Sequence, residues 1–379
     1  MTDQNIENDA LIKDIVRDSL RIWGSPIEKS DEKRIMSDYR RYLFRKYLFI
    51  IGCIVLTVAV IGFALTIGDY HIGFLECYSV IWDHITGNIQ HELEDSIIFN
   101  LRLPRIAAGV LAGMALAISG VVMQSTLMNP LADSYTTGVS SGASLGATLG
   151  IVFGFSLFNV SQYGTILNAF VFSLIPMTMI IVISKIKNAS PTTMIMGGIA
   201  IMYLFNAFTT VFTLMANPDQ LADLYKWSVG SLGFAGSADI PIIASFVIPV
   251  SIILMLLTNK LNALASGDES AKSLGVDADR FRRICLILVA LLVAAVVSFT
   301  GLIGFVGLVA PHIVRIFIGA DNRYLLPASA AFGALLLVVS DLIGRTIISP
   351  AILQVGVIMA FLGGPLFLWL VLRKKSAVW

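Results

Sequence analysis

The stretch YLFIIGCIVLTVAVIGFALTI, residues 47–67, is about 20 residues long and contains no charged side chain. Because the hydrocarbon core of a bilayer is about 30 Å thick, an apolar run of this length predicts a helix that spans a membrane. The run begins well inside the chain and lacks a small-residue cleavage site, which indicates an uncleaved span and not a secretion signal. The predicted fold class is therefore an all-α membrane protein.

The composition extends this prediction to the whole chain. Of the 379 residues, 56% are hydrophobic and 13% are charged, and the mean hydropathy is +0.83, whereas a soluble domain has about 25% charged residues. The net charge of +1 is no guide to nucleic-acid binding in such a chain. What is informative in a membrane protein is how the charges divide between the two membrane faces. The scattered cysteines Cys53, Cys77 and Cys285 suggest packing and not a disulfide framework.

Nine further apolar stretches have the length of a membrane helix. With the first they make ten predicted spans, near residues 47–67, 103–123, 136–155, 164–184, 193–215, 240–258, 281–299, 302–318, 324–343 and 354–372. An even number of spans places both chain ends on one side of the membrane.

The basic residues indicate which side that is. In this chain, most lysines and arginines after the tail lie in loops on the same side of the membrane as the two chain ends. In membrane proteins generally, the cytoplasmic loops are the ones rich in lysine and arginine. Both termini are therefore predicted to be cytoplasmic. The other side holds only Arg102, Arg105, Lys226 and Arg345.

Arg102 and Arg105 are unusual for an outer loop, since residues 47–101 contain no lysine or arginine. We interpret the pair as a docking site for an acidic partner. A structural alternative for Arg105 is that it anchors the end of a helix at the lipid headgroups.

The first 45 residues are predicted to form a cytoplasmic tail ahead of a transmembrane domain at residues 46–375. In this tail Leu11, Ile15 and Val16 recur at helical spacing together with Ile12 and Leu20, which predicts an amphipathic helix. Such a helix can rest loosely on the membrane surface, or the tail can be partly disordered, and the sequence leaves both open.

Two predicted spans carry small residues along one face, which lets a neighbouring backbone approach closely. In the third span these are Gly138, Gly142, Gly146 and Gly150. In the second span they are Gly109, Gly113, Ala117 and Gly120. We expect the second and third spans to pack against each other, and a weak echo between residues 120–146 and 307–333 predicts an inverted repeat.

Several functional classes are disfavoured. The chain has no Gly-x-x-x-x-Gly-Lys-Ser/Thr string, so it does not hydrolyse ATP by that route, and its histidines show no metal-ligand spacing. An ion-coupled transporter needs carboxylates at the bilayer centre, but here the acidic residues lie in loops. Asp341, near the outer end of the ninth span, is expected to form a structural ion pair with Arg345.

Four polar residues enter the predicted spans near the cytoplasmic face: Gln124, Asn129, His312 and Arg315. They can line a pathway, or they can cap helix ends and satisfy backbone groups that Pro130 and Pro311 set free. We favour the capping role.

The cytoplasmic loop at residues 259–281 contains the segment Gly267-Asp-Glu-Ser-Ala-Lys-Ser-Leu-Gly275. This segment predicts a short helix between two glycines, with Asp268 and Glu269 in its first turn, where acidic residues suit the helix dipole. Such a helix is either a solvated connector or a knob that fits the groove of a partner subunit.

Taken together, the ordered motifs resemble the FecCD-type permeases of ABC importers, which carry iron-siderophores, haem and cobalamin. The resemblance covers residues 47–375. Its motifs are Leu103-Pro-Arg105, Ser119-Gly120 to Gln124, Asn129-Pro-Leu-Ala132, Gly138-Val-Ser-Ser-Gly-Ala143, Ala271-Lys-Ser-Leu-Gly275, Gly301-Leu-Ile-Gly-Phe-Val-Gly-Leu-Val-Ala-Pro-His-Ile-Val-Arg315, Asp341 to Arg345 and Gly363-Gly-Pro-Leu-Phe367.

This resemblance implies a ten-helix subunit with the type II importer permease fold, paired with a second copy in a homodimer around a central pathway. It also implies two cytoplasmic ATPase subunits, which would bind ATP and Mg, and an external binding protein. Arg102, Arg105 and Arg345 would meet glutamates of that binding protein, because guanidinium forks suit carboxylates.

The resemblance also implies roles on the cytoplasmic side. Coupling to the ATPase would fall to Gly267, Asp268, Glu269, Ala271, Leu274 and Gly275. The gate and pathway would be formed by Pro191, Thr192, Thr193, Met194, Gly197 and Gly198, with the fifth span, Met194 to Met215, lining the pathway. No catalytic, cofactor or metal site is implied in this chain.

Three features depart from the family pattern. The N-terminal tail has no usual counterpart. The segment Ser349-Pro-Ala-Ile-Leu-Gln-Val-Gly356 replaces a usual Glu-Leu-Pro before the Val-Gly, and Pro191 stands in a turn that is usually built from small hydroxyl residues.

We therefore expect a permease subunit of an ABC importer that moves a metal chelate across the cell membrane of a prokaryote. A proton-coupled secondary transporter is the alternative, and an intramembrane enzyme is disfavoured because no nucleophile, metal or acid–base set is present. The sequence leaves iron-siderophore, haem and corrinoid open as substrates, with oxyanions less favoured.

Overall fold

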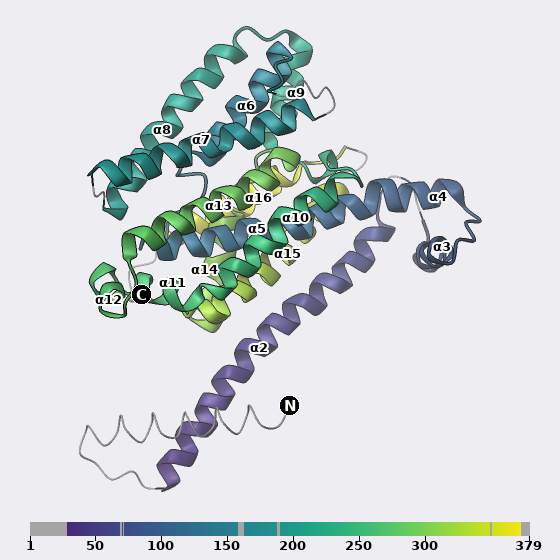
Figure 1. Cartoon of the computed structure of the whole chain (residues 1–379). Helices are drawn as coiled ribbons and strands as arrows, with labels where there is room; N and C mark the ends of the chain where they lie inside the picture. Colours follow the sequence, from purple (N-terminus) through teal and green to yellow (C-terminus); the bar gives the residue numbers. More distant parts are fainter. Residues whose placement is uncertain are drawn as a thin grey trace. The chain divides into compact units, whose positions relative to one another are not determined.

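The structure is a computed structural model that describes residues 29–68, 70, 72–157, 163–187, 190–348 and 351–372. These residues form helices joined by turns and short extended segments, with no strand among them (Figure 1). The chain divides into two compact units, residues 1–48 and 49–379. Helix α2, Lys29–Thr66, begins in the first unit and continues into the second. The amphipathic helix predicted in the tail lies outside the described residues.

Each of the ten predicted spans corresponds to a helix. Seven helical segments are long and apolar enough to cross a membrane: residues 36–66 of α2, residues 92–126, α7 (Gly164–Lys187), α8 (Pro191–Thr213), α10 (Asp239–Leu256), α13 (Ala278–Thr300) and α15 (Asn322–Thr346). The other three are shorter apolar helices: α6 (Val139–Phe153), α14 (Val306–Ile318) and α16 (Val355–Leu372). The predicted all-α membrane fold is confirmed.

Shorter helices that were not predicted fill the longer connections. On the side predicted to be outside, these are α3 (Phe74–Thr86), α4 (Glu92–Ser96), the π-helix η1 (Ile97–Arg102), α9 (Pro218–Val229) and the 3₁₀-helix η2 (Leu232–Phe234). Helix η1 leads directly into α5 (Leu103–Thr126). The loop predicted to be cytoplasmic contains α11 (Thr258–Ala265), which was not predicted, and α12 (Asp268–Ser273), which was.

Helix α9 shows how local sequence starts one of these elements. The Asn217 side chain accepts a hydrogen bond from the Gln220 backbone amide, at 2.9 Å, and the Gln220 side chain accepts one from the Asn217 amide, at 3.0 Å. This reciprocal capping box, followed by Pro218 in the first turn, satisfies backbone donors that the start of a helix leaves without partners.

Helix α5 is the centre of the bundle and packs against α10, α13, α14 and α15. Its glycine face meets α14 and α15 and not α6. A Cβ atom at Gly113 would lie 2.2 Å from the carbonyl oxygen of Gly333, and one at Gly120 would lie 1.9 Å from that of Gly307. The prediction that the small faces of the second and third spans meet is therefore wrong.

The glycine face of α6 packs against α7 instead. A Cβ atom at Gly142 would lie 2.4 Å from the carbonyl oxygen of Phe172, and one at Gly146 would lie 2.4 Å from that of Asn168. Further along the same face, Gly150 meets Thr165. Each small face thus allows the close approach that was predicted, but each has a different partner from the predicted one. Figure 1 shows α6 to α8 grouped together, apart from α14 and α15.

The two segments of the predicted inverted repeat, residues 120–146 and 307–333, contact each other at Gly120 and Gly307. The repeat itself stays a prediction. The three cysteines are buried thiols without disulfide bonds, which confirms their predicted packing role.

Candidate functional site

The predicted coupling segment is a short helix in the loop predicted to be cytoplasmic. Helix α12 lies between Gly267, with a φ of 109°, and Gly275, with a φ of 77°, backbone conformations that favour glycine. Ala271 is buried, whereas Glu269 is exposed and Leu274 is 69% exposed. The predicted helix is confirmed, and it exposes an acidic and an apolar side chain. Its role in coupling stays a prediction.

A buried arginine holds α12 in place. The guanidinium of Arg282, on α13, donates hydrogen bonds to Asp268 Oδ1 at 2.5 Å, to Asp279 Oδ1 at 3.1 Å and to the Thr126 carbonyl oxygen at 3.1 Å. It therefore joins the coupling helix, the start of α13 and the end of α5. Our sequence reasoning did not single out Arg282, although the Asp279–Arg282 spacing of three residues on a helix was a signal.

A second anchor lies one helix earlier in the same loop. The Asn262 side chain, on α11, donates to Asp321 Oδ1 and accepts from the Asn322 backbone amide, both at 2.8 Å. Ser125, at the end of α5, donates to the Asn322 side chain at 3.2 Å. The loop that carries α12 is thus tied to both α5 and α15.

Asp321 is strongly acidic at this anchor. Burial alone would raise its pKa, but hydrogen bonds from the side chains of Arg323 and Asn262 outweigh burial and lower the pKa to about 2. The carboxylate therefore stays ionised at any physiological pH, and it caps the start of α15 by accepting from the Arg323 backbone amide.

Two of the four polar residues predicted near the cytoplasmic face connect helices, and a third stabilises a turn. Gln124 accepts a hydrogen bond from Arg315 at 3.0 Å and donates to the Gly307 carbonyl oxygen at 3.4 Å. The Asn129 side chain accepts from the Leu131 backbone amide at 2.9 Å. These contacts agree with the structural role that we favoured over pathway lining.

On the side predicted to be outside, one buried carboxylate pairs with two arginines. Arg105 donates to both oxygens of Asp341, with distances of 2.8 to 3.1 Å, and Arg345 Nε lies 3.1 Å from Asp341 Oδ2. The predicted ion pair between Asp341 and Arg345 is confirmed. Arg102 lies close enough to Arg345 to affect it electrostatically, and we call Arg102, Arg105 and Arg345 with Asp341 the outer arginine cluster.

Arg102 and Arg345 also cap the outer end of α2. Arg102 donates to the carbonyl oxygens of Leu65, at 2.5 Å, and Tyr70, and Arg345 donates to those of Ala64, at 3.3 Å, and Ile67, at 3.1 Å. The last carbonyls of a helix lack partners within the helix, and its C-terminal end attracts cations.

This geometry bears on the predicted docking site. Arg102 is 6% exposed and Arg345 is 9% exposed, and both guanidinium groups are engaged within the chain. Their contact with a binding protein stays a prediction, to which the structure adds a second role inside the subunit.

The predicted gate residues form the start of α8. The Ser190 hydroxyl accepts from the Thr193 backbone amide at 3.3 Å, and Pro191 occupies the first turn. Thr192 and Thr193 are exposed, whereas Met194 is buried. Their role as a gate stays a prediction.

The two gate glycines differ in their surroundings. A Cβ atom at Gly198 would lie 2.8 Å from the Thr136 carbonyl oxygen, so Gly198 allows α8 to approach the turn before α6. At Gly197 the nearest such neighbour is 3.8 Å away.

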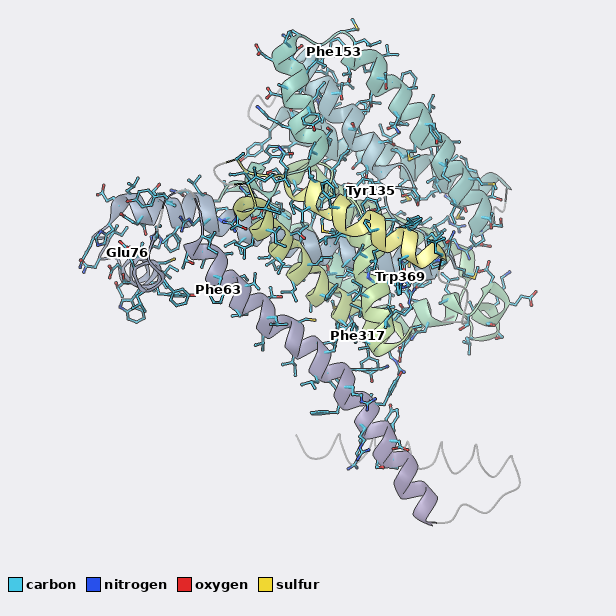
Figure 2. All side chains as sticks on the ribbon, turned by 180° about the vertical axis from the view of Figure 1, so that it is seen from behind. Phe63, Glu76, Tyr135, Phe153, Phe317 and Trp369 are labelled. Atoms are coloured by element: carbon cyan, nitrogen blue, oxygen red, sulfur yellow. The ribbon has the colours of Figure 1, made fainter. Side chains whose placement is uncertain are left out.

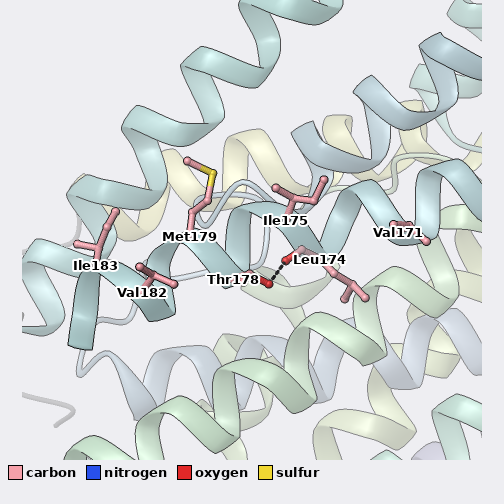
Figure 3. Close-up of a pocket in the computed structure, with 7 residues that line it drawn as sticks. All are labelled: Val171, Leu174, Ile175, Thr178, Met179, Val182 and Ile183. Carbon is pink, nitrogen blue, oxygen red and sulfur yellow. Dashed lines mark hydrogen bonds between the residues drawn. The ribbon is translucent and has the colours of Figure 1, made fainter. Parts of the chain in front are cut away.

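A shallow depression runs along one face of α7 (Figure 3). It is lined by Val171, Leu174, Ile175, Thr178, Met179, Val182 and Ile183. The Thr178 hydroxyl donates its hydrogen to the Leu174 carbonyl oxygen at 2.9 Å, inside the helix. The depression therefore suits lipid chains or a neighbouring helix better than a charged ligand. Nowhere in the described part of the chain do three His, Cys, Asp or Glu side chains gather as a metal site.

The model of the FecCD transport family matches residues 55–373. This chain belongs to the FecCD transport family. Among its relatives, the hemin transport system permease protein of Yersinia pestis is 39% identical over 314 residues, which cover 82% of this chain and 93% of that protein. The vitamin B12 import system permease protein of Vibrio cholerae is 37% identical over 288 residues, covering 75% and 85%.

A solved structure supports the same conclusion. The FecCD chain matches a transporter described as a metal-chelate type ABC transporter in an inward-facing conformation, with a TM-score of 0.74 and 29% identity over 85% of this chain and 98% of that one. The type II importer permease fold is therefore confirmed. The FecCD chain is an ABC transporter permease and an integral membrane protein.

Proposed function

We propose that this FecCD permease is the membrane subunit of an importer that moves a metal chelate into the cytoplasm. A separate ATPase would drive it, and an external binding protein would supply it. The observation that carries the proposal is the anchored coupling helix α12, because a helix tied by Arg282 to both α5 and α13 can pass on a push from a partner. Alternating access then follows as a shift between conformations that the ATPase biases.

The pathway would lie along α8. This helix contains no charged residue and is mostly exposed in the subunit, including the polar side chains of Asn206 and Thr210. Polar side chains are costly against lipid, which supports a second copy or a water-filled pathway on this face. We infer a homodimer in which two copies of α8 face each other.

Cysteine crosslinking tests this arrangement. With the native cysteines buried, a cysteine at Asn206 or Thr210 should form a disulfide between two copies, which requires Cα atoms within about 7 Å. A cysteine at the exposed Val182, on α7, serves as the control and should stay monomeric. A crosslink at Val182 with none at Asn206 or Thr210 would place the interface on another face.

Docking of the binding protein is proposed at the outer face that contains Arg102, Arg105 and Arg345. The gathering of three guanidinium groups, which suit carboxylates, supports contact with an acidic surface. We expect binding-protein affinity to fall as salt rises from 10 to 300 mM, because screening shortens the reach of charge from about 30 Å to below about 8 Å. Affinity that does not change with salt would argue against an electrostatic dock.

Transport in proteoliposomes tests the function as a whole. The permease, its ATPase and its binding protein should take up chelate only with ATP, and a hydrolysis-dead ATPase should abolish uptake. Uptake that continues with the dead ATPase, or that a protonophore stops while ATP is constant, would favour proton coupling.

Asp133 offers a further test between ATP-driven and proton-coupled transport. It lies in the turn between α5 and α6, where burial raises its pKa to about 6 against the opposing effect of hydrogen bonds from Ser134. A proton-coupled transporter would need such a carboxyl group. On our proposal, Asp133→Asn retains ATP-driven uptake without a change in its pH profile.

The relatives named for hemin and for vitamin B12 have similar sequence identity to this chain, so sequence identity alone does not indicate which chelate is transported. The absence of charge on α8 fits a pathway that lets cargo pass without holding it tightly. Titration of the purified binding protein with haem, cobalamin and an iron-siderophore should identify the cargo.

A further inference from the structure

Helix α3 has three faces, each with a different character. One face is buried and contains Cys77 and Val80. A second is polar, with Glu76, Ser79, Asp83 and Thr86 at helical spacing. The third is apolar and exposed, and it consists of Phe74, Leu75, Tyr78, Trp82 and Ile85.

The orientation of α3 is set by its contacts on the buried side. His84 Nδ1 lies 2.7 Å from Asp95 Oδ1, and the His84 ring stacks on Phe99 with centroids 3.6 Å apart. At the start of the helix, the Glu76 side chain accepts from the Gly73 amide at 3.1 Å. Because the buried face is held against α4 and η1, the direction of the apolar face is fixed as well.

The apolar face of α3 lies against the last turns of α2. Phe63, on α2, lies 6.0 Å from Phe74 between ring centroids, and Phe74 lies 5.0 Å from Tyr78. A Cβ atom at Gly62 would lie 2.5 Å from the Tyr78 hydroxyl oxygen. Gly62 is four residues before the end of α2, which is about one helical turn of 5.4 Å. Figure 2 shows Phe63 and Glu76 at the same end of α2.

These distances place α3 beside the last turn of α2, at the end of the apolar segment that is long enough to cross a membrane. Leu75 is 83% exposed, Ile85 71% and Trp82 67%, which is a large apolar surface for water to cover. Tryptophan and tyrosine collect at the boundary between lipid tails and headgroups, where one end of the side chain is apolar and the other wet.

The charge of residues 70–101 indicates what the apolar face of α3 can contact. Residues 70–101 contain no lysine or arginine and several carboxylates, so neither an acidic protein surface nor an anionic lipid is attracted to it. An uncharged or zwitterionic lipid layer meets the apolar face without repulsion, and the polar face then turns toward water.

We propose that α3 lies in the outer headgroup layer of the bilayer, with the face formed by Phe74, Leu75, Tyr78, Trp82 and Ile85 in contact with lipid. The helix is then a membrane-surface anchor for the outer end of α2, next to the outer arginine cluster. The proposal does not depend on the identity of the cargo.

Spin labels on the intact permease with its ATPase, in phosphatidylcholine nanodiscs, test the proposal. Single cysteines replace Leu75 or Ile85 on the apolar face, and Ser79→Cys on the polar face is the matched control. Labels at 75 and 85 should collide more with oxygen, which concentrates in lipid, and several-fold less with a water-soluble nickel chelate than the label at 79.

Three results would overturn the proposal. Equal accessibility to the nickel chelate on both faces would place α3 in water. Protection of labels 75 and 85 from both reagents would indicate that a protein covers the apolar face. That protein is a second copy of the chain, or it is the binding protein if the protection appears only when the binding protein is added.

If spin labelling disturbs the fold, a second experiment measures the quenching of Trp82 fluorescence by brominated lipid in the unlabelled protein. In that case Trp82→Phe should remove a quenchable component that Trp227→Phe leaves in place, and quenching that is the same in both variants contradicts the proposal.

Discussion

Asp341 shows how the permease handles charge inside a membrane protein. A buried carboxylate is costly unless it is paired and hydrogen-bonded, and here Arg105 supplies three close contacts and Arg345 a fourth. Arg345 also donates from Nη1 to the backbone carbonyl oxygens of Ala64 and Ile67 at the end of α2. Removing any member of the group therefore leaves a buried polar atom without a partner.

Arg105→Gln should destabilise the subunit by about 3 kcal/mol, the lower end of the range for breaking a buried pair, because Arg345 still neutralises Asp341. Thermal unfolding in detergent measures this as a midpoint lower by several degrees. Lys226→Gln is the control, since Lys226 is an outer cation whose pair with Asp223 is exposed, and its midpoint should not change. Equal midpoints for both variants would contradict a structural role for Arg105.

Asp321 predicts a dependence on pH. Its pKa in the folded protein, about 2, lies below the value of about 3.9 for an unfolded chain. The ionised group therefore stabilises the fold fully above about pH 4, and this contribution is lost as the pH falls from about 4 to about 2. Asp321→Asn should lower the unfolding midpoint at pH 6 and lower it less at pH 3. Exposed Asp223→Asn should show no difference at either pH, and a gap for Asp321→Asn that is constant with pH would count against this account.

At this scale the sequence allowed some contacts to be predicted and not others. The pair of Asp341 with Arg345 followed from a spacing of four residues on one helix. The contacts of Arg102 and Arg345 with α2, and those of Arg282 with Asp268 and Thr126, join segments far apart in the chain. No local pattern reports such contacts, because they exist only once the helices have packed.

Among the elements, the glycine faces decide how closely helices approach. A Cβ atom at Gly120 would overlap the Gly307 carbonyl oxygen, so α5 and α14 are in backbone contact there. The pattern of small residues predicted a close approach correctly. It could not predict the partner, because a smooth face is complementary to any other smooth face of suitable length.

Gly120→Ala should therefore force α5 and α14 apart and cost about 2 kcal/mol or more, as overpacking does. Gly52→Ala is the matched control, because among the described residues no atom outside the neighbouring backbone of α2 lies within 4 Å of a Cβ atom there. Unfolding midpoints in detergent should fall for Gly120→Ala and stay level or rise slightly for Gly52→Ala. The close contact would be refuted if Gly120→Ala behaved like Gly52→Ala.

The ten spans were predictable because each is a continuous run of mostly apolar residues in the sequence. The outer helices α3 and α9 were missed, since a search for long apolar runs passes over short helices with a polar face. The coupling helix α12 was found because two glycines and two acidic residues mark its start and end.

For the whole molecule, α5 connects the outer arginine cluster with the residues that anchor α12. Its 24 residues cover about 36 Å, from Arg105 in the outer arginine cluster to Thr126, which accepts a hydrogen bond from Arg282. Movement of α12 thus reaches a helix that extends to the opposite side.

Arg282→Gln should loosen this connection. In proteoliposomes we expect ATP hydrolysis to continue while chelate moved per ATP falls about tenfold, within the range for a coupling of 1–3 kcal/mol. Arg280→Gln, exposed on the same turn of α13, should transport normally, and Arg282→Lys should recover only part of the coupling. Hydrolysis and transport that fall together, in an assembled complex, would show a general defect instead.

The capping of α2 by Arg345 has a consequence for biosynthesis. Arg102 reaches the end of α2 from 37 residues later, whereas Arg345 reaches it from about 280 residues later. The carbonyls of Ala64 and Ile67 therefore wait for Arg345 until almost the whole chain has been made, and a nascent chain that stops before Arg345 leaves them without this partner. The cap therefore marks the difference between a finished subunit and a truncated one.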